Sequence, residues 1–249
     1  MTRTDSEIGD RTVRDETLGL LWEGRTAPTR GPKPALSIVR IADAAMRIAD
    51  AEGLAAVSMQ RVAAELDFTK MSLYRYVAGK AELLAIMIEA AVGDPPDLRR
   101  VRGGWRRKLE TFARELAATW QRHPWLPWAT VGDRPMGPRE TAWTEAPLSA
   151  LAGTGLTGGE QLDAVFVLFG HIRNTHSMSM AGTQAWTTDK QPRQPMAQLL
   201  PRHRERFPAL TAALASAAKT GSADNGRAFG LRLLLDGLAL LIDERAARA

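Results

Sequence analysis

The sequence predicts an all-α protein, and two observations carry this prediction. From Leu36 onward, apolar residues recur at the i, i+3, i+4 spacing of a buried helical stripe. No stretch alternates apolar and polar residues as a half-buried strand does. Hydrophobic residues make up 45% of the 249 residues, so the chain can bury a sizeable core.

The composition excludes several kinds of chemistry. The chain contains no cysteine, which rules out disulfides, thiolate metal sites and a cysteine nucleophile. No apolar run approaches the roughly 18 residues of a membrane span. The first residues, "MTRTDSEIGDRTVRDE", lack the apolar stretch of a secretory signal. We therefore expect a cytoplasmic protein with no membrane contact.

Residues 1–35 are expected to form a polar arm. The segment "LGLLWEG" (18–24) can form a short helix, whereas the prolines and glycine of "RTAPTRGPKPALS" favour an extended chain. Residues 1–24 hold three Arg against six Asp or Glu, but residues 25–80 hold nine Lys or Arg against five. The positive excess permits a nucleic-acid partner, although solvated helix faces explain charge alone about as well.

Residues 36–93 are expected to contain four helices. The first, within "LSIVRIADAAMRIADAEG", ends at Gly53, a residue type favoured just after a helix. Ser58 caps the second helix, "MQRVAAEL", and Thr69 caps a third over roughly residues 70–77. A fourth helix, "KAELLAIMIEAAVG", follows Gly79. The buried stripe of the first helix is Ile38, Ile41, Ala42, Ala45, Ile48 and Ala49.

Three short helices within about 40 residues fit a helix-turn-helix, in which one helix enters the major groove and its neighbour braces it. Leu73 and Val77 lie four residues apart and can anchor the third helix to a core. The chain's two tyrosines, Tyr74 and Tyr76, fall beside Arg75 on this helix. Such hydroxyls can donate to phosphate, and Arg can neutralise phosphate or read guanine. An ordinary helical bundle is the alternative at this point.

The stretch "IADAAMRIADAEGLAAVSMQRVAAELDFTKMSLYRYVAGKAELL" closely resembles the DNA-binding region of the tetracycline-repressor (TetR) family of bacterial regulators. The matching features are the "AA" of the first helix, Gly53, Ser58, "VAAEL", "SLYRYV" and "GKAELL". "RGPKPALS" resembles the basic arm of many members. "GWRRKLETFARELAATWQRHPWL", "RPMGPRETAWTEAPLSALAGTGL" and "FGLRLLLDGLALLI" look like the ligand-binding half of the tetracycline-repressor subgroup. The resemblance covers residues 25–245.

The resemblance implies a set of DNA contacts. Ser58, Lys80 and both tyrosines are expected to hold phosphates, and Gln60 to reach a base or the backbone. Residues 70–72 and Arg75 are expected to point into the major groove. Three alternatives stay open: Tyr76 packs between helices, Met71 packs under the turn, and Gln60 is merely solvated. The DNA-binding candidates are Arg30, Lys33, Ser58, Gln60, Thr69, Lys70, Met71, Ser72, Tyr74, Arg75, Tyr76 and Lys80.

Residues 105–245 are expected to form a ligand-binding and dimerisation domain, joined to the first by "GDPPDLRRVRGG". Helices are expected at 105–122, 138–152, 158–181, 204–218 and 224–245, with loops at "HPWLPWATVGDRPMGP" and "TTDKQPRQP". Six of the seven Trp follow residue 100, as suits an apolar ligand site, although most could be core. The candidate pocket residues are Phe112, Leu116, Trp120, Trp128, Trp143, Phe166, Phe169, His171 and Arg173.

His171 and His176 invite a metal interpretation, because the tetracycline-repressor subgroup binds its drug with a metal ion. Five residues on a helix separate two side chains by roughly 140°, so both cannot serve one ion as an i, i+4 pair does. No carboxylate is suitably spaced. We expect no metal and no other cofactor.

The C-terminal helix carries an apolar face made by Phe229, Leu233, Gly237 and Leu240. A wholly buried helix at a chain end is unusual, so a partner is expected. In relatives, this helix and the one at 158–181 pair with their symmetry mates in a four-helix dimer interface.

These observations together predict a homodimeric regulator that binds a palindromic DNA operator and is released by a small hydrophobic effector, as a repressor is. An enzyme is not expected, because the sequence has no G-x-S-x-G, P-loop, H-E-x-x-H or credible triad. The alternatives are an all-α scaffold that binds protein, or an enzyme, either without DNA-binding activity.

Overall fold

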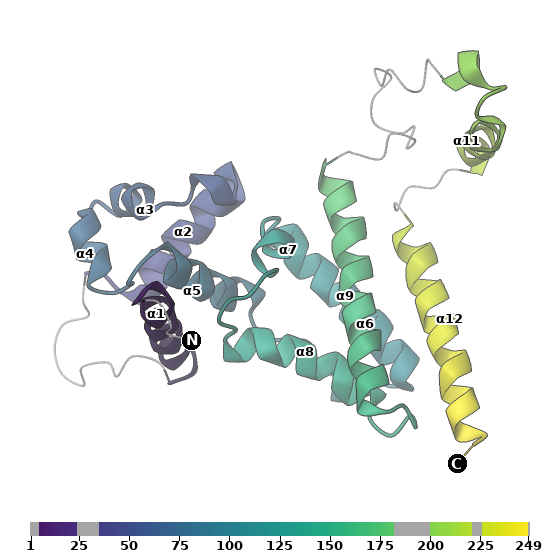
Figure 1. Ribbon diagram of the computed structural model, residues 1–249, viewed down its shortest axis with the longest axis horizontal. Helices are drawn as coiled ribbons and strands as arrows, with labels where there is room; N and C mark the ends of the chain where they lie inside the picture. The colour runs from purple at the N-terminus through teal and green to yellow at the C-terminus, as the bar shows by residue number, and fades with distance from the viewer. Residues whose placement is uncertain (1–4, 24–34, 182–199, 221–225, 249) are drawn as a thin grey trace. The chain divides into compact units, whose positions relative to one another are not determined.

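The computed structural model describes residues 5–23, 35–181, 200–220 and 226–248, and every regular element in these ranges is helical (Figure 1). The all-α prediction is confirmed. The chain divides into two compact units, Met1–Ala150 and Leu151–Ala249. None of the helices in the described ranges is long and apolar enough to span a membrane.

Helix α1 (Asp5–Glu23) corrects the expectation of a short helix at 18–24, because it has 19 residues. Thr17 is buried, and Leu18, Leu20 and Leu21 are half-buried on the same helix. The helix packs against α5 (Lys80–Val92). The contact with α5 stabilises this helix, although its acidic composition alone predicts a solvated arm.

Capping residues set the boundaries of the next three helices. Helix α2 (Ile38–Glu52) ends at Gly53, whose φ of 87° lies in the region that favours glycine. Helix α3 (Met59–Glu65) begins after Ser58, and α4 (Lys70–Tyr74) begins after Thr69. Helix α4 is shorter than the expected 70–77, and the chain continues as a turn in which the Val77 N–H donates to the Leu73 carbonyl.

The core of this region lies between α2, α3, α4 and α5. Arg61 of α3 ties two helices, because its guanidinium lies 2.9 Å from Glu52 of α2 and 2.8 Å from Glu65 of α3. Helix α5 packs against α2. The fully buried side chains include Ile41, Ile48, Val62, Leu73, Val77, Leu83 and Met87.

The rest of the first unit comprises α6 (Trp105–Arg122), α7 (Leu126–Ala129) and α8 (Pro138–Leu151), whose last residue belongs to the second unit. The sequence predicts a loop where α7 forms. A proline is tolerated in the first turn of a helix, so Pro127 does not prevent this helix. The Trp125 indole N–H donates to the Asp50 carboxylate over 2.7 Å and fastens this region to the end of α2.

In the second unit, α9 (Gly158–Ala181) and α12 (Arg227–Ala246) lie side by side and antiparallel (Figure 1). Glu160 at the start of α9 pairs with Arg245 at the end of α12. The His171 ring nitrogen Nε2 lies 2.9 Å from the Arg227 carbonyl oxygen. A Cβ at Gly230 would clash with the His171 ring, so glycine permits this close approach.

The second unit also contains a short turn of 3-10 helix, Leu200–His203, and α11 (Pro208–Thr220). Helix α11 begins four residues later than the expected 204. The expected loop "TTDKQPRQP" lies outside the described residues.

Acid should loosen the α9–α12 pair of the second unit. The Arg245 guanidinium, and then the Thr157 backbone N–H, lower the pKa of Glu160 from 4.5 to about 2. Because the ionised form is favoured in the folded state, its stabilisation is complete above the ordinary carboxyl pKa and is lost as pH falls towards 2. We expect Glu160→Gln to lower the thermal midpoint at pH 7 and to have a smaller effect at pH 3.

Glu205→Gln provides a matched control, because Glu205 is an exposed carboxylate of the same unit that lies outside α9 and α12. Thermal unfolding followed by circular dichroism at both pH values tests the prediction. A Glu160→Gln effect that is equal at pH 7 and pH 3 would contradict it.

Candidate nucleic-acid interface

The outer face of α4 is a short polar surface fixed on a buried base. Leu73 and Val77 are both fully buried, which anchors the helix and the turn that follows it. Met71 is 73% exposed and Tyr74 is 40% exposed. The Lys70 ammonium lies 5.5 Å from the centre of the Tyr74 ring, a cation–π distance. The surface therefore presents an ammonium, a phenol and a thioether to solvent.

The predicted caps are formed, and they fix two hydroxyl groups. The Ser58 hydroxyl accepts the Arg61 N–H over 3.1 Å, which leaves its own proton available to a phosphate oxygen. The Thr69 hydroxyl accepts the Ser72 N–H over 3.2 Å and lies 2.9 Å from the Ser72 hydroxyl. The capping role of Ser58 and Thr69 is confirmed, while their DNA contacts stay predictions.

The turn between α4 and α5 holds two further candidates. Tyr76 is half-buried, which is compatible with both phosphate binding and packing between helices. Lys80 is exposed in the first turn of α5. Glu82 is buried, and its carboxylate accepts the Ala78 N–H, so the turn is held from within α5. Sequence reasoning missed Glu82, although its place three residues after the N-cap Gly79 is a position from which a carboxylate can reach back.

The remaining DNA-binding candidates are placed unevenly. Gln60 is exposed on α3, the helix that precedes α4 in the helix-turn-helix, and it is next to Arg61. Arg61 itself is engaged with Glu52 and Glu65, so it braces the helices. Arg75, the last of the major-groove candidates, is exposed at the end of α4. Arg30 and Lys33 lie outside the described residues.

The pocket candidates of the first unit form a buried aromatic core. Phe112, Leu116, Trp120 and Trp143 are all less than 5% exposed. The rings of Phe112 and Trp143 are 5.7 Å apart and tilted by 57°. The Trp143 indole N–H points at the Val92 and Gly93 carbonyls, each at 3.1 Å, where α5 ends. Phe112 and Trp143 therefore pack together beside the end of α5, while Leu116 and Trp120 are buried elsewhere along α6.

The other pocket candidates do not share this environment. Trp128, on α7, is 63% exposed, and Phe166, on α9 of the second unit, is 77% exposed. Both side chains lie at the surface of the isolated chain, whereas the sequence predicts that they line a ligand pocket. Phe169, His171 and Arg173 are half-buried on α9. No group of three or more metal-ligating side chains occurs among the described residues.

Comparisons with known proteins agree with this arrangement. Residues 41–87 match the family described as bacterial regulatory proteins, tetR family, and residues 96–242 match the tetracyclin repressor-like C-terminal domain. The HTH-type transcriptional repressor DrrR1 of Streptomyces coeruleorubidus is 38% identical over 238 residues, 92% of this chain and 87% of the relative.

Solved structures show the same fold. Apo ActR from Streptomyces coelicolor superposes with a TM-score of 0.70 at 24% identity, covering 88% of this chain and all of that one. ActR in complex with (S)-DNPA gives a TM-score of 0.64 at 25% identity, covering 84% of this chain and 98% of that one.

Two substitutions on α4 should separate sequence reading from phosphate binding. Tyr74→Phe loses only a hydroxyl, so we expect target and unrelated DNA to bind more weakly alike, by about 1 kcal/mol. Arg75→Ala should cost about 1–3 kcal/mol and blur preference at one base pair if Arg75 reads guanine. Affinities for the target and for each single-base variant of its half-site provide the measurement.

Both variants should still fold and dimerise, because neither side chain belongs to the Leu73–Val77 anchor. If Arg75→Ala weakens binding to all DNA variants equally, Arg75 contacts only phosphate. Base reading is then left to residues 70–72 and Gln60.

Proposed function

This chain belongs to the tetracycline-repressor (TetR) family of bacterial regulators, and we propose that it represses transcription from a near-palindromic operator until a small hydrophobic effector releases it. The observation that carries the proposal is the exposed face of α4, whose Lys70, Met71 and Tyr74 stand outward on the buried Leu73. A helix presented in this way fits the major groove, and Lys80 adds a phosphate contact at the start of α5.

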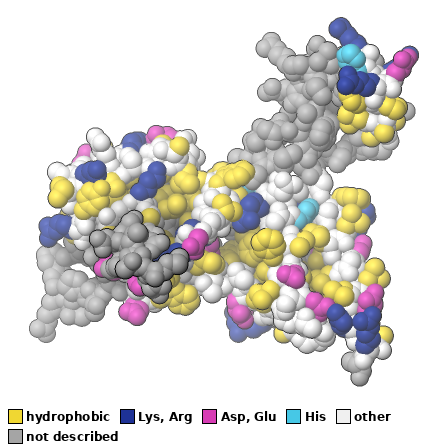
Figure 2. Space-filling view, viewed as in Figure 1, with side chains coloured by type: hydrophobic (Ala, Val, Ile, Leu, Met, Phe, Trp, Pro, Cys, Tyr) yellow, Lys and Arg dark blue, Asp and Glu magenta, His cyan; other side chains and the backbone are white. Residues whose placement is uncertain are grey.

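The exposed apolar faces of α9 and α12 favour a homodimer. Figure 2 shows hydrophobic side chains on the viewer's face of these helices. Gly237 is also exposed on α12 and permits a close approach of backbones. Large exposed apolar patches mark association sites in soluble proteins. The patch consists of Leu162, Phe166 and Val167 on α9 and of Phe229, Leu233 and Leu240 on α12.

A dimer explains how the protein selects its site. A two-fold axis places two recognition helices in successive major grooves, roughly 34–36 Å apart, so the operator repeats the symmetry of the protein. An effector that alters this spacing reduces binding. To move occupancy from 99:1 to 1:99, it must favour the released form by about 5.5 kcal/mol.

Helix α5 provides the route for this coupling within the first unit. It begins at Lys80 and ends where Trp143 donates to the Val92 and Gly93 carbonyls. Trp143 in turn contacts Phe112, so a molecule that displaced this aromatic pair would also shift the end of α5. An aromatic, hydrophobic effector suits such side chains, and the complex of ActR with (S)-DNPA supports a small organic molecule.

A regulator of this kind meets its operator in the cytoplasm and needs no catalytic residue. Its relatives are transcription regulators, and we assign the chain no enzymatic role.

Salt dependence tests the proposal directly. With about six to ten phosphate contacts per dimer, affinity for the DNA upstream of its own gene should fall roughly 10³–10⁵-fold between 50 and 200 mM salt. Lys80→Gln should flatten the log–log slope by about 2, one contact from each subunit. Arg114→Gln, an equal charge change at an exposed position of α6, should leave the slope unchanged. A flat dependence for the unaltered protein would refute phosphate binding.

Assembly is tested by placing charge on the apolar patch. Replacing both Leu233 and Leu240 with Glu buries charges at the proposed interface and should give monomer or aggregate. Ala212→Glu together with Ala213→Glu, an equal charge addition at exposed positions of α11 outside the patch, is the control. Sedimentation that shows an intact dimer for the double variant would place the interface elsewhere.

A further inference from the structure

Helix α1 lies outside both matched segments, 41–87 and 96–242, yet it is docked at two places. The Arg14 guanidinium binds both carboxylate oxygens of Asp133, with Nη1 and Oδ2 2.9 Å apart. The Trp22 indole N–H donates to the Met136 carbonyl over 3.0 Å. Thr17, between these contacts on the helix, is only 3% exposed. Helix α1 is therefore fastened to the loop of residues 131–136.

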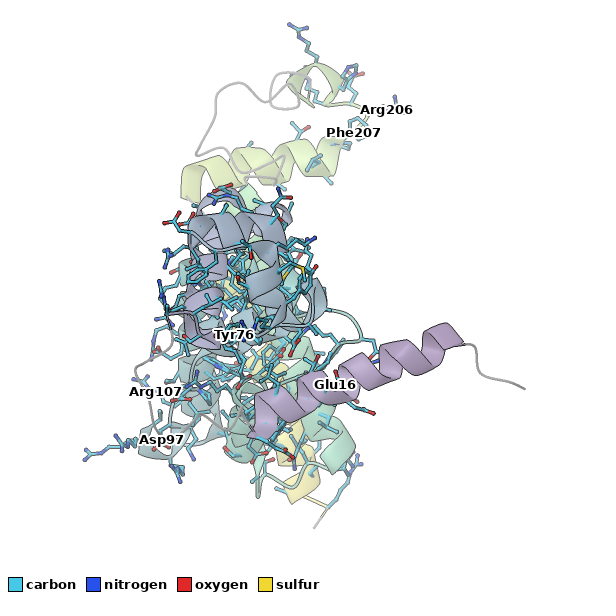
Figure 3. The ribbon with its side chains drawn as sticks, turned by 90° about the vertical axis from the view of Figure 1, so that its left-hand side faces the viewer. Glu16, Tyr76, Asp97, Arg107, Arg206 and Phe207 are labelled. Atoms are coloured by element: carbon cyan, nitrogen blue, oxygen red, sulfur yellow. The ribbon has the colours of Figure 1, made fainter. Side chains whose placement is uncertain are left out.

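The same helix covers the first turns of α5. A pocket of about 170 Å³ remains at this junction, so the helices are close but not fully packed. Figure 3 shows α1 in front of the other helices of the first unit, with Glu16 labelled on it. The pocket is lined by Arg14 and Thr17 of α1, by Ala81, Leu84 and Ala85 of α5, and by residues 133–135.

The part of α5 that α1 covers is the part that carries the proposed DNA contact. Lys80 is in its first turn, and the turn from α4 leads directly into it. Glu82 holds the Ala78 N–H of that turn. Leu83 and Met87 are fully buried, and α5 packs on α2. The start of α5 is thus held by α2 and by α1, and it fixes Lys80 and the end of the recognition helix.

The loop that receives α1 is itself firmly attached. Arg134 forms a largely buried ion pair with Glu140 in the first turn of α8. The Glu89 carboxylate of α5 accepts the Arg139 N–H over 2.6 Å and the Glu140 N–H over 3.3 Å. The Arg14 guanidinium lowers the pKa of Asp133 below its usual value, so the Asp133 carboxylate stays ionised at neutral pH. The loop can therefore serve as an anchor for α1.

We propose that α1 is a positioning element for DNA binding: its Arg14–Asp133 and Trp22–Met136 contacts clamp the start of α5 between α1 and α2. The clamp holds Lys80 and α4 in the orientation that meets the major groove. This inference rests on the proposed function, because it concerns DNA affinity, but the clamp itself is a property of the free protein.

Charge alone predicts the opposite effect of α1. Residues 1–24 carry six acidic against three basic residues, so α1 by its charge repels DNA. Any substitution that makes this region more positive should then tighten binding. If α1 acts as a clamp, a positive substitution that breaks the Arg14–Asp133 pair should weaken binding.

The test compares two substitutions of equal charge. Asp133→Arg adds two positive charges and sets Arg against Arg14, at a side chain that is 87% exposed and not needed for the core. Glu16→Arg adds the same charge at an exposed position of α1. We expect Asp133→Arg to weaken affinity for a duplex of the protein's upstream DNA about two- to fivefold, the range of an exposed ion pair. Glu16→Arg should leave affinity unchanged or tighter.

A charge swap supplies the rescue. Arg14→Asp together with Asp133→Arg restores an ion pair with no net change in charge, and its affinity should return to within about twofold of the original. Amide hydrogen exchange over residues 80–85, measured without DNA, should be faster in Asp133→Arg and normal in Glu16→Arg and in the swap.

Equal tightening by Asp133→Arg and Glu16→Arg with unchanged exchange would overturn the proposal, and so would a swap that fails to restore affinity. If the unaltered protein does not bind its upstream DNA, the proposed function fails. The exchange measurement then still decides whether α1 clamps α5.

Discussion

The burial of Leu73 and Val77 is the interaction on which the DNA-binding surface depends. Helix α4 has five residues, far fewer than an isolated helix needs to be stable in water. Its shape is therefore imposed by the burial of Leu73, by packing against α3 and by the Thr69 cap. Because burial of Leu73 supplies the order, the identities of the outward Lys70, Met71 and Tyr74 can follow the DNA sequence to be read.

Helix α5 connects the DNA-binding surface to the buried aromatic side chains of the first unit. Its 13 residues span roughly 20 Å at the rise of an α-helix. One end bears Lys80, and the other accepts the Trp143 indole. Because its faces contact both α1 and α2, we expect α5 to move as one body when its far end is displaced. In the proposed function, these contacts are the route by which effector binding at the far end of α5 reaches the DNA-binding surface.

Local chemistry explains what the sequence could predict. Ser58, Thr69 and Gly53 act on their own neighbours, so the boundaries they set are visible without a structure. The sequence predicts only the end of α1, because the helix is stabilised by docking onto distant residues near 133–136, which no local pattern reports. The burial of aromatic side chains is equally hard to predict from sequence. Phe112 and Phe166 have the same hydrophobicity, yet Phe112 is fully buried and Phe166 is exposed in the isolated chain.

In the proposed complex, two copies of α4 enter the major groove of one operator. Dimethyl sulfate footprinting on the upstream DNA reports this most directly, because the reagent methylates guanine N7 in the major groove. We expect two clusters of protected guanines centred about one helical turn apart, and weaker protection in Arg75→Ala. Bound protein that leaves guanine N7 fully reactive at both half-sites would contradict it.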